Sequence, residues 1–178
     1  MKNNSLPLCV WLTGLSGAGK TTIAHQLHNI FTDNKIPCYV LDGDVLRSGI
    51  NADLGFSDED RSENIRRVSH IAKILMNAGI TPIISLISPF KKDRDLAKAI
   101  INPNSFIEVY IKCSLESCIQ RDPKGLYKKA LGGEILNFTG LDSPYETPVS
   151  PDILIDTEST SIQASVSTLW NYVKDLIP

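Results

Sequence analysis

Short apolar runs alternate with amphipathic stretches along most of the chain. Between these runs, apolar residues recur at spacings of three and four, which indicates helices that each bury one face. Strands that alternate with helices are typical of a parallel sheet covered by helices on its faces. The pattern therefore predicts an α/β fold with a five-stranded parallel sheet, whose strands are expected over residues 8–13, 37–41, 82–87, 106–111 and 153–155.

The expected helices occupy the gaps between these strands. Ser57 and the acids after it form a capping box that opens a long helix, and Gly79 is a natural residue to end it. In the helix expected over 93–101, the spacing places Leu96 and Ala97 toward the core. Further helices are expected over 20–33, 115–120 and 162–177.

Residues 121–151 lose this periodicity and fill with Lys, Gly and Pro. Such a long connection inside a compact fold is usually functional. The segment from Arg121 to Lys129 packs four positive charges into nine residues, which suggests that it clamps phosphate groups. The sequence therefore predicts a lid over about 121–150 that keeps water from a reaction, with a solvated basic loop as the alternative.

Length, charge and composition narrow the classes of protein. A chain of 178 residues fits a single domain spanning 1–178. Eighteen Lys and Arg against twenty Asp and Glu give a net charge of -2, which argues against the basic footprint of a nucleic-acid-binding protein. No apolar run reaches the roughly 18 residues of a membrane span, and Met1–Ser5 has no signal-peptide character. The four cysteines have neither disulfide nor zinc spacing, which is typical of a protein in the reducing cytoplasm. Together with the net charge and the lack of a long apolar run, this predicts a cytoplasmic protein without nucleic-acid or membrane partners.

The segment Gly14–Thr21 matches the phosphate-binding motif G-x-x-x-x-G-K-[ST]. It follows an expected strand and opens an expected helix, which is the context that the motif requires. Glycines let backbone N–H groups curl around phosphate oxygens, and the helix N-terminus adds a positive end. Lys20 would supply charge to the β- and γ-phosphates of ATP, and the Thr21 hydroxyl would ligate Mg²⁺. The alternative is an ordinary glycine turn between strand and helix.

Two acids, Asp42 and Asp44, follow the second expected strand. Most P-loop ATPases instead carry their Mg²⁺-linked Asp after a later apolar strand, but here Ser88 follows the strand over 82–87. An acid after the second strand faces the P-loop across the crevice, where it can hold a Mg²⁺-bound water or accept a proton from a substrate hydroxyl. This placement favours a small-molecule kinase over a motor or GTPase, with a simple Asx turn as the alternative.

The long helix begins with polar residues on its apolar face. At about 100° per residue, Arg61 and Asn64 project on the same side as the core stripe. Because unpaired burial of such groups is costly, a ligand with hydrogen-bonding groups would explain them. Arg47 could bind an anion or form a surface ion pair, and Phe56 could stack on a base or staple the helix start.

In combination, these segments resemble the adenylylsulfate (APS) kinase family of the P-loop kinase superfamily. The resemblance covers about residues 8–156, and it departs from the family at Leu131, where many members carry a basic residue. Its motifs are WLTGLSGAGKTT at 11–22, LDGD at 41–44, LGFS at 54–57, DR at 60–61, ENIRR at 63–67, SPF at 88–90, RDPKGLYKKA at 121–130 and FTGLDSPYE at 138–146.

The resemblance implies that ATP phosphorylates the 3′-hydroxyl of adenosine 5′-phosphosulfate, giving ADP and 3′-phosphoadenosine 5′-phosphosulfate (PAPS), with Mg²⁺. Phe56 and Phe138 would sandwich the adenine of APS, and the arginines with Asn64 would hold its phosphosulfate. ATP would be bound by Gly14, Leu15, Ser16, Gly17, Ala18, Gly19, Lys20, Thr21, Thr22 and Arg121. APS would be bound by Asp42, Asp44, Arg47, Phe56, Arg61, Asn64, Ile87, Ser88, Lys124, Leu126 and Phe138. Catalysis would rest on Lys20, Asp44 and Ser88, and the metal on Thr21 and Asp44.

Some alternatives stay open at this point. The same scaffold could phosphorylate another nucleoside 5′-anhydride, or it could bind nucleotide without turnover, although Lys20, Thr21 and Asp44 argue against the second. Descriptions of the family often give Ser88 a phosphoserine intermediate, whereas in-line transfer to a bound hydroxyl needs only positioning and charge stabilisation. The resemblance also implies a separate ATP sulfurylase upstream, and it leaves a homodimer undecided.

Overall fold

The computed structural model describes residues 7–177, so the expectation about Met1–Ser5 lies outside the described residues. All neighbouring strands of its central sheet run parallel, in the order β2-β3-β1-β4-β5. The predicted five-stranded parallel sheet is therefore confirmed, with β1 at its centre. The strands are β1 (Cys9–Thr13), β2 (Cys38–Asp42), β3 (Thr81–Ser85), β4 (Phe106–Lys112) and β5 (Ile153–Asp156).

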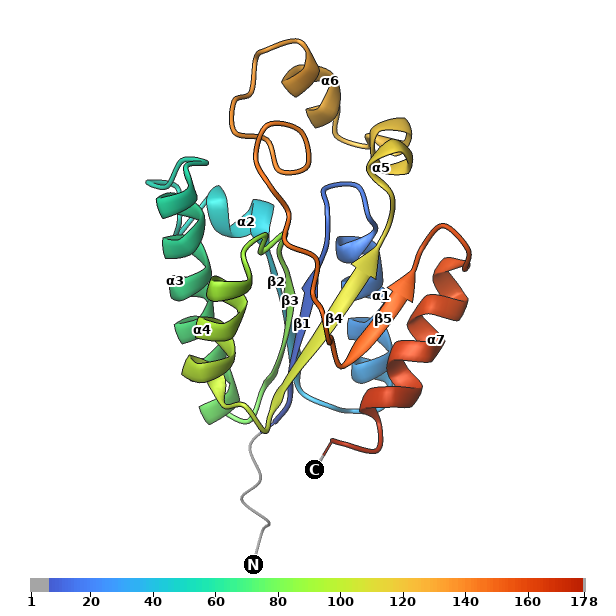
Figure 1. The fold of residues 1–178 in the computed structure, drawn as a ribbon. Helices are drawn as coiled ribbons and strands as arrows, with labels where there is room; N and C mark the ends of the chain where they lie inside the picture. The colour runs from blue at the N-terminus through green and yellow to red at the C-terminus, as the bar shows by residue number, and fades with distance from the viewer. Residues whose placement is uncertain (1–6, 178) are drawn as a thin grey trace, which may run out of the picture.

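Helices cover both faces of the sheet. The helices of the described chain are α1 (Lys20–Asp33), α2 (Gly43–Arg47), α3 (Asp58–Asn77), α4 (Lys91–Ile101), α5 (Leu115–Arg121), α6 (Leu126–Leu131) and α7 (Ile162–Val173). Figure 1 shows α3 and α4 on one face and α1 and α7 on the other, with α5 and α6 beyond the carboxyl ends of the strands. No helix within residues 7–177 is long and apolar enough to cross a membrane.

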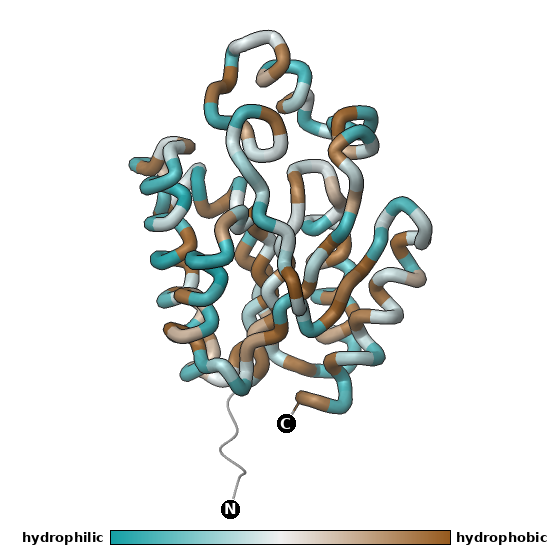
Figure 2. Tube along the Cα trace, viewed as in Figure 1, coloured by the Kyte–Doolittle hydropathy of each residue, from teal (hydrophilic) through white to brown (hydrophobic). Residues whose placement is uncertain are grey.

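The alternation of side chains along β1 divides the core into two layers. Val10 and Leu12 pack with α1 and α7, whereas Cys9 and Trp11 pack with α3 and α4. All residues of β1 are buried, as expected for a central parallel strand. Figure 2 shows the hydrophobic residues concentrated along the strands and polar residues along the outer turns of α3 and α4.

The third strand ends earlier than its apolar run predicts. β3 stops at Ser85, so Ile87 and Ser88 lie in the loop before α4. The Thr13 hydroxyl donates a hydrogen bond to the carbonyl of Ile87 at 2.7 Å, and Ser88 has a φ of 41°. This left-handed conformation turns the chain out of the sheet and toward the carboxyl edge.

The buried face of α4 also differs from the prediction. Leu96 is 43% exposed, so its expected inward position is wrong, while Ala97 is fully buried. The charged residues Asp93 and Arg94 are buried instead. They can be buried because Asp93 accepts a hydrogen bond from Ser62 and Arg94 forms a salt bridge with Glu108 at 2.8 Å.

The lid region contains more regular structure than its sequence predicts. Asp122 accepts hydrogen bonds from the backbone N–H groups of Tyr127 and Lys128, which fixes the first turn of α6. The ring of Tyr127 packs edge-on against Phe138 at 4.9 Å, and its hydroxyl donates to the carbonyl of Ser16 at 3.1 Å. The lid is thus packed on itself and fastened to the loop after β1.

Candidate nucleotide and substrate site

A cavity of about 720 Å³ opens between the sheet's carboxyl edge and the lid. Parallel sheets of this kind bind ligands at this edge. Of the residues predicted to form the site, all line the cavity except Gly14 and Leu15. The fold therefore gathers residues from six separate segments, including the start and the middle of the lid, around one volume of ligand size.

The loop after β1 has the backbone shape of a phosphate cradle. Gly14 has a φ of 150°, and a Cβ there would lie 2.5 Å from the carbonyl oxygen of Ile111, so a side chain would clash with β4. Gly19 has a φ of 103° at the start of α1, a conformation that L-residues rarely adopt. These constraints leave the N-terminus of α1 open toward the cavity, where its dipole favours an anion.

Lys20 lies almost buried within this loop, with 7% exposure. Its Nζ donates hydrogen bonds to the carbonyl oxygens of Gly14 and Leu15 at 2.9 and 2.7 Å. Burial lowers the pKa of Lys20 from its ordinary 10.5 to about 8. A phosphate in the cradle would restore the charged form, so Lys20 is held ready for an anionic ligand.

The Thr21 hydroxyl donates a hydrogen bond to Asp42 Oδ2 at 2.8 Å, and Ser85 Oγ lies 3.3 Å from it. The other oxygen of Asp42 accepts the backbone N–H of Asp44 at 3.0 Å, which caps α2. The carboxylate beside Thr21 is therefore that of Asp42. The sequence predicted Thr21 and Asp44 as the metal ligands. It could not show that Asp42 lies beside Thr21, because this placement depends on the register of β2 with β3, in which Asp42 pairs with Ser85.

Hydroxyl and carboxylate oxygens are ligand types that Mg²⁺ accepts. Mg²⁺ keeps several of its waters and takes one or two protein oxygens together with substrate phosphates. A hydroxyl and a carboxylate beside a phosphate cradle supply that set, with Thr21 and Asp42 as the candidate ligands. Within residues 7–177, no group of three or more His, Cys, Asp or Glu could hold a metal.

Asp44 occupies a different position at the rim of the cavity. It lies in the first turn of α2, a short helix that the sequence pattern did not predict, and its side chain is 64% exposed. Its carboxylate forms an ion pair with Lys124 of the lid. This contact joins the lid directly to the acid that was predicted to accept a proton.

Two arginines place positive charge in the cavity wall. Arg47 and Arg61 lie on the ring of Phe56, at 4.6 and 5.6 Å from its centroid. Neither forms a salt bridge within the described residues. Burial lowers the pKa of both guanidinium groups, and the charge of Arg47 lowers that of Arg61 further. An anionic ligand would relieve both effects.

The polar start of α3 faces inward, as its helical spacing predicts. Arg61 and Asn64 are 7% and 5% exposed. The protein itself satisfies part of Arg61, whose guanidinium donates to the carbonyls of Phe56 and Asn137 at 3.1 and 2.7 Å. A ligand is therefore not the sole partner of this arginine, contrary to the simplest reading of the sequence.

The two aromatic residues predicted to hold a base come from opposite walls. Phe56 is 51% exposed at the start of α3, and Phe138 is 7% exposed in the lid. Both line the cavity. The edge-on contact with Tyr127 holds the ring of Phe138 in place, whereas the ring of Phe56 carries the two arginines.

Ser88 is buried at the base of the cavity. It is 2% exposed, and its Oγ accepts a hydrogen bond from Trp11 Nε1 at 3.1 Å. Arg94 donates to the Ser88 carbonyl at 2.8 Å and thus holds its left-handed turn. Sequence reasoning missed Arg94, although its spacing to Ala97 and Ile101 places it on the buried face of α4.

Arg121 lies at the far end of the cavity, beside the loop between β5 and α7. Its guanidinium donates to the hydroxyl and carbonyl oxygens of Thr157 at 3.1 and 2.7 Å. The Thr157 hydroxyl in turn donates to the carbonyl of Ala18 at 2.9 Å. Thr157 is a cavity residue that the sequence did not single out, and it links Arg121 to the phosphate cradle.

The family model described as adenylylsulphate kinase matches residues 6–156. The chain belongs to the adenylylsulphate kinase family. A probable adenylyl-sulfate kinase of Halalkalibacterium halodurans is 50% identical over 173 residues, which cover 97% of this chain and 86% of that protein. An adenylyl-sulfate kinase of Oceanobacillus iheyensis is also 50% identical over 173 residues, covering 97% of this chain and 87% of the relative.

A solved structure agrees with this membership of the adenylylsulphate kinase family. The Mycobacterium tuberculosis APS kinase CysC in complex with AMPPNP and APS has a TM-score of 0.91 and 42% identity. The alignment covers 95% of this chain and 98% of that one. The resemblance to APS kinases, the P-loop fold and the status of a kinase are thus confirmed.

Proposed function

We propose that the protein transfers the γ-phosphate of ATP to the 3′-hydroxyl of adenosine 5′-phosphosulfate, giving ADP and PAPS. The observation that carries the substrate assignment is the pair Arg47 and Arg61. Neither forms a salt bridge within the described residues, and both line a cavity that also holds a phosphate cradle. The relatives named adenylyl-sulfate kinase and the solved complex with APS support the same substrate.

ATP takes the half of the cavity formed by the P-loop and α5. The backbone N–H groups at the start of α1 bind its phosphates, and Lys20 Nζ moves from two carbonyl oxygens to the β- and γ-phosphates. Arg121 and Thr157 lie at the adenine end. When Mg²⁺ is bound, Thr21 and Asp42 would hold it, and it would neutralise charge on the transferring phosphoryl group.

APS takes the half formed by the start of α3, the loop before α4 and the lid. Arg47, Arg61 and Asn64 bind its phosphosulfate, and the rings of Phe56 and Phe138 take opposite faces of its adenine. Ile87 and Leu126 add apolar contacts. Because both aromatic residues accept any flat base, the charge at the 5′ end carries more of the specificity than the rings do.

Asp44 accepts the proton of the attacking 3′-hydroxyl, and Lys124 closes over the same carboxylate from the lid. Closure of the lid excludes water, so that ATP is not simply hydrolysed. Substrate entry requires that Lys124 exchange its contact with Asp44 for an oxygen of the bound ligand. The positive charge of Lys124 therefore has two uses: it holds the lid closed by pairing with Asp44, and it helps to bind the substrate.

The test of the proposed function compares acceptors in a coupled assay of ADP release. The acceptors are APS, adenosine monophosphate and a cytidine 5′-anhydride. We expect kcat/KM to be clearly higher for APS than for adenosine monophosphate, since APS offers two anionic groups, phosphate and sulfate, to Arg47 and Arg61. We expect a smaller difference between APS and the cytidine anhydride, because the rings of Phe56 and Phe138 accept any flat base. Equal rates with all acceptors would favour a broader nucleoside 3′-kinase, and ATP binding without ADP release would favour a binding module.

The role of Ser88 has a separate test. Its Oγ is tied to Trp11 and almost buried, so we propose that it contacts substrate and forms no phosphoserine. In-line transfer in one step inverts the configuration of a chiral γ-phosphoryl group. We therefore expect inversion when ATP chiral at the γ-phosphorus is used with APS. Net retention would instead require two transfers and would support a covalent step at Ser88.

The proposed reaction also implies a supplier of APS. An enzyme that joins sulfate to the α-phosphate of ATP with release of pyrophosphate, an ATP sulfurylase, must act first, and we propose that it is a separate chain. The reaction fits the cytoplasm, where ATP is available and where the four cysteines would stay reduced, as they are here.

A further inference from the structure

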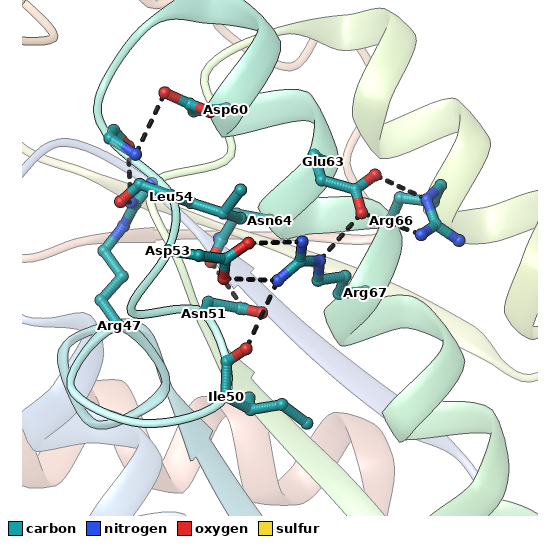
Figure 3. A network of polar contacts seen from close by, with 11 residues as sticks. Arg47, Ile50, Asn51, Asp53, Leu54, Asp60, Glu63, Asn64, Arg66 and Arg67 are labelled. Atoms are coloured by element: carbon teal, nitrogen blue, oxygen red, sulfur yellow. Dashed lines mark hydrogen bonds and ion pairs between the residues drawn. The ribbon is translucent and has the colours of Figure 1, made fainter.

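The loop between α2 and α3 holds a buried polar pair behind the substrate half of the cavity. Asn51 is fully buried, and its Nδ2 donates a hydrogen bond to Asn64 Oδ1 at 2.9 Å (Figure 3). The remaining oxygen of Asn51, Oδ1, is buried and has no hydrogen-bond partner within the described residues. A buried oxygen without a partner costs free energy, so its presence in the native fold calls for a compensating use.

The hydrogen bond from Asn51 fixes which way the carboxamide of Asn64 is oriented. A carboxamide has an accepting oxygen and a donating nitrogen, and rotation by half a turn exchanges the two. Asn51 takes the oxygen of Asn64, which leaves the Asn64 Nδ2 as its free polar atom in a residue that lines the cavity. The phosphosulfate oxygens of APS only accept hydrogen bonds, so they require this orientation and not the reverse.

We infer that Asn51 is a positioning residue that holds the donating side of Asn64 toward the phosphosulfate of APS. The inference rests on the proposed function and deepens it. Asn51 does not line the cavity, so it acts on the substrate only through Asn64. Because Asn51 presents its Nδ2 to Asn64, its own Oδ1 is left buried without a hydrogen-bond partner within the described residues.

The loop that carries Asn51 is fastened from the outside by Arg67. The guanidinium of Arg67 donates two hydrogen bonds to the carboxylate of Asp53 at 2.7 and 2.8 Å, and one to the carbonyl of Ile50 at 3.4 Å. Arg67 Nε also binds Glu63 at 2.8 Å on the same helix. Figure 3 shows Arg67 and its contacts to Asp53, Ile50 and Glu63 beside the pair Asn51 and Asn64.

The end of the loop is fastened as well. Arg47 donates to the carbonyls of Leu54 and Gly55, and Asp60 accepts the N–H of Gly55 at 3.0 Å. The backbone of Asn51 is itself bonded, from its N–H to the Leu46 carbonyl at 2.9 Å. With both ends of the loop tied to helices, Asn51 has little freedom to leave Asn64, as a positioning role requires.

The test asks whether loss of Asn51 affects APS and ATP differently. A positioning role for Asn51 changes the KM for APS alone, whereas a general structural role changes the KM for both substrates. Asn51→Leu keeps the branched shape and the number of side-chain heavy atoms, although its methyl groups are bulkier, and it removes the donor. We expect the KM for APS to rise about five- to tenfold, the loss typical of one hydrogen bond, while kcat and the KM for ATP stay within about twofold. Ser48→Ala is the matched control, since the Ser48 hydroxyl donates to the carbonyl of Val45 in α2 and forms no hydrogen bond with Asn51 or Asn64, so all three constants should stay unchanged.

The dependence on Asn64 is tested in a double-mutant cycle. In an Asn64→Leu background, adding Asn51→Leu should leave the KM for APS unchanged, because there is no carboxamide left to orient. Thermal melting of every variant checks the fold, and Asn51→Ala replaces Asn51→Leu in the cycle if the latter melts below the assay temperature.

Two results would overturn the inference. One is a KM for APS that stays at the wild-type value in the Asn51 variants. The other is an increase that is undiminished in the Asn64→Leu background, or that moves the KM for ATP in parallel. Absence of APS-dependent ADP release by the wild-type chain would contradict the proposed function itself, and it is therefore distinguishable from a failure of this inference.

Discussion

Replacement of Asp44 by alanine is expected to lower kcat with APS by about 100-fold or more. The physical reason is that Asp44 is the acid at the cavity rim that can take the proton of the 3′-hydroxyl, and a positioned base contributes about 10²–10⁴-fold. Asp42, the other acid, is already bonded to Thr21 and to the backbone at the start of α2. Asp44 has no structural bond of that kind; its ion pair with Lys124 joins two exposed side chains.

The measurement is steady-state ADP release with both substrates varied. Glu59→Gln is the matched control, because Glu59 is an exposed acid in the first turn of α3 and does not line the cavity. Its kcat should equal that of the wild type. If Asp44→Ala retains activity within about threefold of wild type, Asp44 is not the base, and the role passes to another group.

Replacement of Lys20 by methionine is expected to lower kcat/KM for ATP by at least about 10²–10³-fold. Lys20 Nζ lies in the phosphate cradle, where its positive charge stabilises the negative charge on the phosphoryl group during transfer. Loss of one such stabilising group lowers the rate by about 10²–10³-fold. The aliphatic stem fills the same buried space in both side chains. Loss of activity in a variant that melts near the wild-type temperature would therefore report chemistry and not misfolding.

The lowered pKa of Lys20 adds a second, pH-dependent signature. In the folded chain its pKa is about 8 against an ordinary 10.5, so the unfolded chain gains the proton first as pH falls. Stability is therefore lost as pH falls from 10.5 to 8 and is constant with respect to this group below 8. Lys20→Met should not show this loss, and denaturant unfolding at several pH values measures it.

The same pKa predicts proton uptake when ATP binds. Near pH 8 about half of the Lys20 side chains are neutral, and the phosphates of ATP favour the charged form. Calorimetric titration in two buffers with different ionisation enthalpies should show an uptake of about half a proton at pH 8, rising at pH 9. Lys20→Arg stays charged throughout and is the control. Equal heats in both buffers for the wild type would contradict the assignment.

Local patterns in the sequence were enough for most of the sheet and for the ligand-binding segments. Burial of alternating apolar runs is a local property, and so is the glycine-rich turn that exposes N–H groups before α1. The inward position of Arg61 and Asn64 also followed from helical spacing alone, and both are buried as expected. The error at Leu96 arose because spacing cannot tell an apolar residue on the rim of a helix face from a salt-bridged Arg94 at its centre.

What the sequence by itself determined is the alternation of the five strands with the longer helices, the phosphate cradle and most of the segments that meet around the cavity. The tertiary structure alone decided which atoms are paired: Asp42 with Thr21, Asp44 with Lys124, and Asn51 with Asn64. The reason is physical. Periodicity and turn chemistry act within a few residues, whereas these contacts depend on strand register, on lid closure and on a loop tied to its neighbouring helices by long-range hydrogen bonds.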